Sequence, residues 1–330
     1  VVSGRERGTT GAILRRFLEA YGSPNLLESE TLRDAAASGA LYATQGLSDL
    51  PAYDLERTSY LLSFGCPVLE SWLSPSYVHR KYGHMRRGAP ERRGRFFQVE
   101  SRLSPTGAKA DEWIRIRPGT EAALALGIAH VLIREGRFNE GFVRDQTFGF
   151  EDLTDSHGNS RIGFKTLVLN DYDPDAVARI AGVPVVTIIR LAREFSGAEH
   201  PLAVGEQRPL SGGLPFLFAV QCLNALVGSI DAPGGVIAQR PLPLNPLPLS
   251  PPDELSRRGR QQSRIDGASG RFPLASTNLP GLADAVLSGN PYPVKILLHC
   301  GADPFSACPD ADRLRRALER IPFIVSFSSL

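Results

Sequence analysis

The sequence lacks closely spaced cysteines. Its 4 cysteines contain no Cys-x-x-Cys pair and stand far apart, as Cys66, Cys222, Cys300 and Cys308. Zinc ribbons and iron–sulfur clusters are held by such pairs or by denser groups of thiolates. The 6 histidines are also scattered without the spacing of metal ligands. From this sequence we therefore expect neither a zinc ribbon nor an iron–sulfur cluster built by these residues alone.

Long apolar runs and an excess of one charge are also missing. No run approaches the roughly 20 apolar residues that a membrane span needs, so we expect no direct membrane span. Lysine and arginine number 37 against 35 acidic residues, which leaves a net charge of +2. So small a charge gives no electrostatic basis for binding nucleic acid, and we expect no nucleic-acid partner.

A dinucleotide fingerprint is absent as well. No Gly-x-Gly-x-x-Gly spacing follows any strand that the sequence predicts. That spacing shapes the tight turn in which many nicotinamide-binding folds hold a pyrophosphate. Its absence weakens one reading of the chain, that of a thiamine- or nicotinamide-binding α/β protein.

The stretch from Phe96 to Gly136 contains a pattern of predicted strands, loops and a helix. Apolar residues predict one strand from Phe96 and a second from Trp113, and a helical spacing of apolar residues predicts a helix that begins after Thr120. A strand, a glycine-containing loop and a helix N-terminus offer free backbone N–H groups to a phosphate or nucleotide. Every α/β protein contains such units, so spacing alone does not assign nucleotide binding.

Similar units recur along the chain and predict an α/β fold with mainly parallel, doubly wound sheets. In such sheets ligands bind beyond the carboxyl ends of the strands. Most of the predicted strand ends carry a glycine, where a ligand could approach the backbone closely. These ends are Ser3-Gly4, Gly65-Cys66, Glu100-Ser101, Gly205-Glu206 and Gly301 to Asp303.

Together these strand ends resemble the molybdopterin oxidoreductases of the dimethyl-sulfoxide-reductase superfamily, which hold molybdenum between two molybdopterin guanine dinucleotides. The specific part is the block PGTEAALALG with AKADEW upstream. Weaker pieces are GRERGTTGAILRRFLEAYGSPN, YLLSFGCPVLES, VARIAGVPVVTIIRLAREFSG, LNALVGSIDAPGG and HCGADPFSACPD. These segments most resemble those of the branch of polysulfide, thiosulfate and tetrathionate reductases.

The resemblance implies two Rossmann-like doubly wound domains, one inserted into the other. Residues 1–31 and 196–330 would form domain II, cut at both ends, and residues 32–195 would form domain III, which binds a dinucleotide. The first residues, VVSG, and the last, PFIVSFSSL, resemble strands at cut edges. We therefore expect a middle piece of the catalytic-type subunit, with a 4Fe-4S cluster outside it.

The resemblance also implies the cofactor-binding residues. Glu100 would bind a ribose hydroxyl and Glu121 the guanine edge, because carboxylates accept paired hydrogen bonds. The alternative for Glu100 is a solvated acid in a loop. The other residues implied at the two cofactor sites are Gly65, Cys66, Glu70, Ser101, Arg102, Gly119, Thr120, Gly205, Gly301 and Asp303.

At the metal ligand the sequence departs from the family pattern. The position where members carry Cys, Ser, selenocysteine or Asp falls near Arg33 and Asp34. Arg33 cannot ligate because a guanidinium stays protonated and offers no lone pair. Asp34 is offset by one residue, which rotates a helical side chain by about 100°. Ligation by Asp34, a metal without a protein ligand and a subunit without molybdenum all stay open; Cys66 is a weaker candidate, since cysteine is commonly a small buried residue.

Two functions follow. The first is the cofactor-binding part of a molybdenum oxidoreductase in an anaerobic-respiration complex, similar to sulfur-compound reductases. Its expected partners are a ferredoxin-like iron–sulfur subunit, an integral membrane anchor, and a small-molecule substrate or the quinone pool, in the periplasm or at the outer face of the bacterial inner membrane. The alternative is a subunit without molybdenum that serves electron transfer or scaffolding in a membrane quinone reductase complex.

Overall fold

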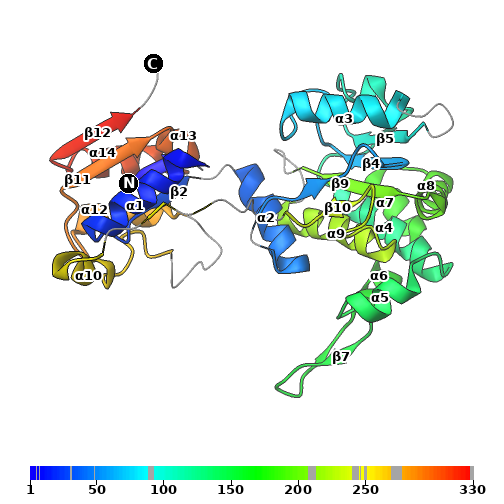
Figure 1. The fold of residues 1–330 in the computed structure, drawn as a ribbon. Coiled ribbons are helices and arrows are strands. Elements are labelled where there is room, and N and C mark those ends of the chain that lie inside the picture. Colours follow the sequence, from blue (N-terminus) through cyan, green and yellow to red (C-terminus); the bar gives the residue numbers. More distant parts are fainter. Residues whose placement is uncertain are drawn as a thin grey trace. The chain divides into compact units, whose positions relative to one another are not determined.

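The computed structural model describes most of the chain. The described residues are 1–4, 6, 8–29, 32–47, 49–87, 93–206, 213–239, 245, 247–248, 251–268 and 277–327, with the backbone alone for 32 and 33. They divide into two compact units, of which the first comprises Val1–Ala35 and Pro241–Leu330 and the second Ala36–Arg240 (Figure 1). The second unit is thus inserted into the sequence of the first.

The first unit is built on a four-stranded sheet in the order β12-β11-β1-β2, in which all neighbours are parallel. The strands are β1 (Val2–Gly4), β2 (Leu27–Ser29), β11 (Ile296–Cys300) and β12 (Phe323–Phe327). The helices are α1 (Thr9–Tyr21), α10 (Glu254–Arg260), α12 (Leu279–Ser288), α13 (Pro304–Ala307) and α14 (Ala311–Leu318). Buried Val2, Leu297 and Leu314 join the sheet to its helices in one apolar cluster.

The second unit contains another four-stranded parallel sheet, in the order β6-β5-β4-β9. Its strands are β4 (Tyr60–Phe64), β5 (Arg95–Glu100), β6 (Glu112–Arg115) and β9 (Pro201–Gly205). Its helices are α2 (Leu32–Gln45), α3 (Pro75–Arg87), α4 (Glu121–Arg134), α5 (Glu140–Gln146), α6 (Phe164–Asp171), α7 (Pro174–Ala181), α8 (Val185–Gly197), α9 (Gly213–Leu226) and the short η2 (Gly107–Lys109). The predicted α/β class with two doubly wound, mainly parallel sheets is confirmed.

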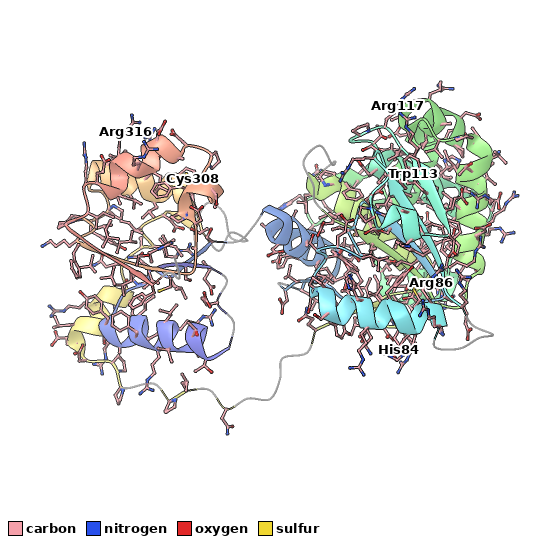
Figure 2. The ribbon with its side chains drawn as sticks, turned by 90° about the horizontal axis from the view of Figure 1, so that it is seen from above. His84, Arg86, Trp113, Arg117, Cys308 and Arg316 are labelled. Atoms are coloured by element: carbon pink, nitrogen blue, oxygen red, sulfur yellow. The ribbon has the colours of Figure 1, made fainter. Side chains whose placement is uncertain are left out.

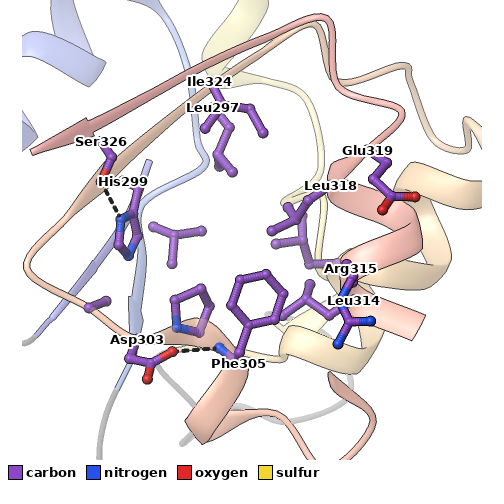
Figure 3. Close-up of a pocket in the computed structure, with 14 residues that line it drawn as sticks. Leu297, His299, Asp303, Phe305, Leu314, Arg315, Leu318, Glu319, Ile324 and Ser326 are labelled. Atoms are coloured by element: carbon purple, nitrogen blue, oxygen red, sulfur yellow. Dashed lines mark hydrogen bonds between the residues drawn. The ribbon is translucent and has the colours of Figure 1, made fainter. Parts of the chain in front are cut away.

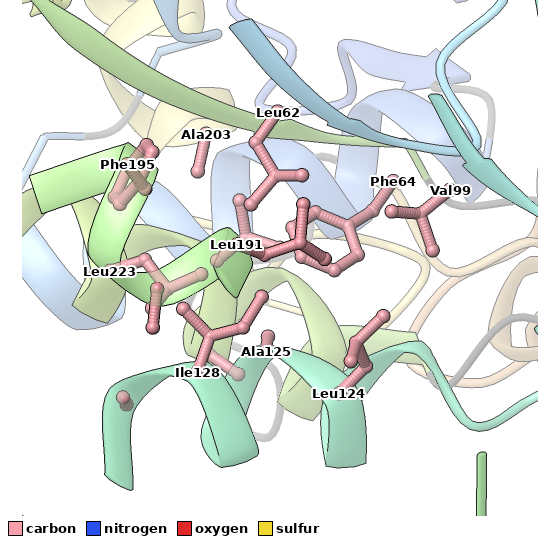
Figure 4. Close-up of a cluster of buried hydrophobic side chains, with 14 of the residues drawn as sticks. Leu62, Phe64, Val99, Leu124, Ala125, Ile128, Leu191, Phe195, Ala203 and Leu223 are labelled. Atoms are coloured by element: carbon pink, nitrogen blue, oxygen red, sulfur yellow. The ribbon is translucent and has the colours of Figure 1, made fainter. Parts of the chain in front are cut away.

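Helices cover both faces of the second sheet, as the continuous apolar run of β4 requires. All five residues of β4 are buried. On one face Phe64, Leu124 and Ile128 belong to a large cluster between the sheet and helices α4, α8 and α9 (Figure 4). On the other face Phe96 packs in a cluster with Val78 of α3. The side chains of β4 are therefore removed from water on both faces of the sheet.

The observed boundary between the units differs from the expected one at residue 196. Strand β9 pairs with β4 along its whole length, from Tyr60 opposite Pro201 to Phe64 opposite Gly205. Residues 196–240 therefore group with the second unit, because β9 is the outer strand of that unit's sheet and is hydrogen-bonded to β4. The other expected boundary, before Leu32, lies at the start of α2, the helix in which the units divide. That these units are domains II and III stays a prediction.

Two small two-stranded elements complete the second unit. Strands β3 (Ala52–Tyr53) and β10 (Val236–Ile237) pair antiparallel, as do β7 (Leu153–Thr154) and β8 (Ser160–Arg161). The β7–β8 hairpin projects from the body of its unit (Figure 1), and Phe148 at its base is 96% exposed. Within the described part of the chain, no helix has both the length and the apolar character to cross a membrane.

Candidate cofactor site at the carboxyl edges of the sheets

Each sheet has a point where the strand order reverses. In the second unit β5 and β6 follow β4 on one side, whereas β9 lies on the other. Neighbouring loops diverge there, which opens a crevice outside the carboxyl ends of the strands. The loops that flank this point begin at Gly65 and Cys66 after β4 and at Glu206 after β9, so the structure brings these predicted strand ends together.

Glu100 ends β5, beside this crevice, and its side chain is only 5% exposed. Its Oε1 accepts a hydrogen bond of 2.7 Å from the backbone N–H of Ser104. Its Oε2 accepts one of 3.1 Å from Nε2 of Gln98. The alternative of a solvated loop acid is therefore wrong, because the carboxylate is buried and held at both oxygens.

The loops after β4 and β5 are fastened to each other by polar contacts. Gln98 Nε2 also donates to the carbonyl of Cys66, at 3.1 Å. The Thr106 hydroxyl donates to Glu70 at 2.9 Å and accepts from the N–H of Leu69 at 3.1 Å. Cys66 and Glu100 are thus joined through Gln98, and Glu70 is joined to the loop after β5 through Thr106, although these predicted residues are separated in the sequence.

Two residues that contact Glu100 were not predicted from the sequence. Gln98 lies in the otherwise apolar run of β5, and a polar residue there was a visible signal. Gly107 gave no such signal in the sequence, because its role is steric. A Cβ atom at this position would lie 2.6 Å from Oε1 of Glu100. Only glycine leaves room for the carboxylate where the loop folds over it.

Glu121 follows β6 and opens helix α4, as predicted. Among the described residues its Oε2 is buried without a hydrogen-bond partner. Burial raises the pKa of Glu121, against the opposite effect of the backbone N–H groups of Glu121 and Gly119. Thr120 occupies the N-cap position but its hydroxyl donates to the carbonyl of Arg117 at 2.6 Å instead of capping the helix. A buried carboxylate oxygen is therefore left for a donor that the described chain does not supply.

The remaining predicted residues of this edge are backbone or surface positions. Gly65 and Gly119 have φ angles of 70° and 79°, in the left-handed region that favours glycine. Gly205 lacks room for a side chain, because a Cβ would lie 2.9 Å from the ring of Phe216 in α9. Ser101 and Arg102 are exposed. The structure thus explains Gly205 by helix packing alone.

The motif AKADEW has a structural role in the second unit. Arg86 pairs with Asp111, whose carboxylate also accepts from the backbone N–H of Phe96 at 2.7 Å (Figure 2). Glu112 pairs with Arg190 of α8 at 2.6 Å. Trp113 donates from Nε1 to the carbonyl of Glu100 at 3.2 Å. This motif therefore fixes β5, β6 and the backbone of Glu100.

The carboxyl edge of the first sheet is chemically different. The ends of β1 and β11 meet so closely that a Cβ on Gly4 would lie 2.6 Å from the carbonyl oxygen of Gly301. Asp303 accepts from the N–H groups of Phe305 and Ser306 at 3.1 and 3.2 Å, and these hydrogen bonds lower the pKa of Asp303. Its carboxylate thus caps α13.

A cavity of about 440 Å³ lies in the first unit between β11, β12 and the helices α12 and α14 (Figure 3). Its walls are apolar, with Leu297, Leu318 and Ile324 among them. At its rim Nδ1 of His299 lies 3.1 Å from the hydroxyl of Ser326. The sequence did not predict this cavity, and its lining suits an apolar group better than a phosphate or a metal ion.

The candidate metal ligands are not brought together. In the part of the chain that the structure describes, no three His, Cys, Asp or Glu side chains lie close enough to hold a metal ion. Asp34 lies in the first turn of α2, and the side chain of Arg33 lies outside the described residues. Cys66 is fully buried, and burial together with Cys66 and Glu206 raises the pKa of Tyr53. The structure therefore does not identify a protein ligand for the metal, and the alternatives drawn from the sequence stay open.

Comparisons with known proteins place this geometry in context. A family model described as molybdopterin oxidoreductase matches residues 7–327. The molybdopterin-containing subunit of the arsenate respiratory reductase of Chrysiogenes arsenatis is 29% identical, over 92% of this chain and 38% of that protein. The molybdopterin-binding-like subunit of the menaquinone reductase of Nitratidesulfovibrio vulgaris is 28% identical, over 99% and 42%.

Subunits of thiosulfate and dimethyl sulfoxide reductases are also among the relatives. Among solved structures, acetylene hydratase from Pelobacter acetylenicus has the same fold, with a TM-score of 0.73 at 20% identity over 98% of this chain and 46% of that one. The chain therefore spans less than half the length of the proteins it matches, at 38%, 42% and 46%.

Proposed function

Because this chain belongs to the molybdopterin oxidoreductase family, within the dimethyl-sulfoxide-reductase superfamily, we propose that it binds molybdopterin guanine dinucleotide as part of a molybdenum oxidoreductase subunit. The proposed setting is an electron-transfer complex of anaerobic respiration. When bound, such a cofactor supplies the atom- or electron-transfer chemistry, whereas the protein supplies binding, orientation and electrostatics.

The unpartnered Oε2 of Glu121 is the observation that carries this proposal. A buried carboxylate oxygen without a hydrogen bond is unfavourable, so such a group calls for a donor. The edge of guanine presents an N–H and an adjacent amino group, which match the two oxygens of a carboxylate. In the proposed complex Glu121 accepts these hydrogen bonds and thereby selects guanine over bases that lack them.

Glu100 would bind the ribose of the same nucleotide. Each carboxylate oxygen has two lone pairs, and the protein donors of Ser104 and Gln98 occupy one on each oxygen. The lone pairs that remain can accept from ribose hydroxyls. Gly65 and Gly119 would let their loops approach the phosphates, since positive φ angles turn the backbone without a side chain in the way.

We propose the complex by likeness to named subunits. The relatives are described as subunits of arsenate and menaquinone reductases. The proposed partners are a ferredoxin-like iron–sulfur subunit, which would carry electrons from a 4Fe-4S cluster, and an integral membrane anchor. The proposed location is the periplasm or the outer face of the bacterial inner membrane.

The decisive experiment measures cofactor content in the full-length protein, purified under anoxic conditions. Guanine nucleotide released by acid is quantified by chromatography, and molybdenum by mass spectrometry. Near-stoichiometric amounts of both support the proposal, and the absence of guanine nucleotide overturns it. Reconstitution of the apoprotein with the cofactor would then show whether Glu121→Gln removes binding.

A second function is favoured by Arg33. Arginine offers no lone pair to a metal, and a relative from Nitratidesulfovibrio vulgaris is described as a molybdopterin-binding-like subunit of a menaquinone reductase. In this alternative the chain lacks molybdenum and serves electron transfer or scaffolding in a membrane quinone reductase complex. The same measurement separates the two, because this alternative predicts neither molybdenum nor guanine nucleotide.

A further inference from the structure

Gln98 is an unusual residue for the centre of a buried parallel strand. Its side chain is fully buried, and it lies on the same face of β5 as Phe96, which packs in an apolar cluster. Directly opposite on β4 stands Ser63, another buried polar residue. Among the described residues both Oε1 of Gln98 and Oγ of Ser63 lack a hydrogen-bond partner. A buried polar pair with unpartnered atoms is unfavourable for folding, so it requires a compensating role.

The orientation of the Gln98 amide follows from its neighbours. The nitrogen lies 3.1 Å from the carbonyl of Cys66 and 3.1 Å from Oε2 of Glu100. Both neighbours are acceptors, so the opposite orientation would bring three oxygens together. The two N–H bonds of the amide are thus used on the loop after β4 and on the carboxylate at the end of β5.

These contacts fix the direction of the Glu100 carboxylate. The Ser104 N–H donates to Oε1 and Gln98 donates to Oε2. Gly107 packs against Oε1 so closely that a Cβ at this position would lie 2.6 Å from it. Rotation of the carboxylate about its last bond would break a hydrogen bond. One lone pair remains on each oxygen for a ligand, and its direction is fixed because the carboxylate is held.

We propose that Gln98 is a positioning residue for nucleotide binding, which fixes the orientation of the Glu100 carboxylate for the ribose hydroxyls. This inference rests on the proposed function. Gln98 itself does not touch the nucleotide. By joining the carbonyl of Cys66 to Glu100, it also sets the loop after β4 relative to the ribose-binding group, so that two walls of the crevice are positioned by one amide.

The test uses the full-length holoprotein with the substitution Gln98→Met, which keeps the volume and removes the amide. We expect guanine nucleotide to be released about tenfold faster, because an unrestrained and poorly solvated carboxylate binds hydroxyls less well. We also expect the variant to lose the preference of the emptied site for guanosine diphosphate over its 2′,3′-dideoxy analogue, because only the first presents the ribose hydroxyls that an oriented Glu100 carboxylate accepts.

Two controls separate positioning from a general loss of stability. Ser63→Ala removes the unpartnered hydroxyl opposite Gln98 and leaves Glu100 untouched, so its release rate and its preference for ribose hydroxyls should equal those of the wild type. Phe96→Leu weakens the same face of β5, and it should lower the melting temperature without changing this preference. If Gln98→Met does not fold, Gln98→Asn provides the measurement, because it retains an amide but withdraws it from Glu100.

The outcomes are distinct. A wild-type holoprotein that carries guanine nucleotide, with an unchanged release rate and an unchanged ribose preference in Gln98→Met or Gln98→Asn, overturns the role of Gln98 but not the proposed function. A change of preference of equal size in Phe96→Leu also overturns it, since the effect would then be structural. A wild-type protein without guanine nucleotide overturns both.

Discussion

The two parallel sheets share a topology but differ at their edges and carboxyl ends. In each sheet the order reverses beside the first strand, next to β1 in one and next to β4 in the other. Every residue of β4 is buried, whereas Phe323 and Phe327 of β12 are 58% and 61% exposed. Equal topology therefore does not give equal packing: a central strand gains stability from both faces, and an outer strand of similar composition does not.

The carboxylates at the carboxyl edges of the two sheets also differ in their hydrogen bonding. Asp303, after β11, uses its oxygens to cap α13. Glu121, after β6, keeps one buried oxygen without a partner among the described residues. The Asp303 carboxylate thus stabilises the start of a helix, whereas the buried and unsatisfied oxygen of Glu121 costs stability until a donor arrives. The predictions below test both contrasts.

The largest expected effect concerns the central strand. We expect Phe64→Ala to lower the free energy of unfolding by about 3–5 kcal/mol, because it opens a cavity among fully buried side chains. The matched substitution Phe323→Ala in β12 should cost less than about 1 kcal/mol. Urea denaturation followed by fluorescence measures both. Similar losses in the two variants would contradict the contrast between the sheets.

Glu121→Gln should have opposite effects on nucleotide binding and on stability. Removing one charged partner of a buried hydrogen-bonded pair costs about 2–5 kcal/mol, so nucleotide affinity should fall about 100-fold or more. The folded-state pKa of Glu121 is raised above its usual value of 4.5. Its contribution to stability is therefore present below pH 4.5 and lost as the pH rises through the folded-state pKa.

In the cofactor-free protein, Glu121→Gln should accordingly raise the melting temperature at neutral pH, and the difference should vanish at acidic pH. Asp303→Asn is the matched control in the other sheet. The pKa of Asp303 is lowered, so its stabilisation is present above the usual value of 3.8 and lost as the pH falls through the folded-state pKa. Scanning calorimetry from pH 3 to 8 should show pH dependences of opposite sign; the same sign in both variants would refute the contrast.

The substitution Arg86→Met tests the structural role of the AKADEW motif. The Arg86 guanidinium pairs with Asp111 in a partly buried site with side chains 11% and 29% exposed. We expect the free energy of unfolding to fall by about 1–3 kcal/mol, because the Asp111 carboxylate loses Arg86 and keeps the backbone N–H of Phe96 and, at 3.3 Å, the more exposed Arg93. Thermal unfolding measures this loss. Nucleotide retention at temperatures where the protein is folded should not change, and a selective loss of nucleotide would show that the motif acts on the ligand.

The smallest effect is expected at the base of the β7–β8 hairpin. Phe148 is 96% exposed, so Phe148→Ser removes almost no buried area and should change stability by less than about 0.5 kcal/mol. The same substitution at Phe64 provides the contrast within one unit. A large loss from Phe148→Ser would mean that this side chain is covered in the full-length protein.

Much of the fold could be predicted because its signals are local. Apolar runs ended by glycine predicted β4 and β9, an apolar run before the polar turn at Glu100 predicted β5, and apolar periodicity after Thr120 predicted α4; the structure confirms these elements. The expected domain boundary at residue 196 stays a prediction, and the compact units divide instead after residue 240, because strand pairing is not local. Nothing in the sequence of β9 indicates that its neighbour is β4, and this pairing decides to which unit 196–240 belong.

The candidate site was predictable only in part, for the same reason. The family resemblance, which the comparisons confirm, identified Glu100 and Glu121, whose roles as ligands stay predictions. Asp111, Glu112 and Trp113 belong to a block that carries the resemblance, and the structure shows that their partners are Arg86, Arg190 and the backbone of Glu100. The partners of a polar side chain lie on other strands and helices, so its spacing in the sequence does not reveal them.

By itself the sequence determined the alternation of strands and helices, the parallel character of the sheets and the residues at the strand ends, since these depend on apolar spacing and glycine positions within short stretches. Only the tertiary structure decided which strand ends meet, that Glu100 is buried rather than solvated, and that Gln98 joins it to the loop after β4. The reason is physical: burial and hydrogen bonding are properties of neighbours in space, and those neighbours are set by the register of strands far apart in the chain.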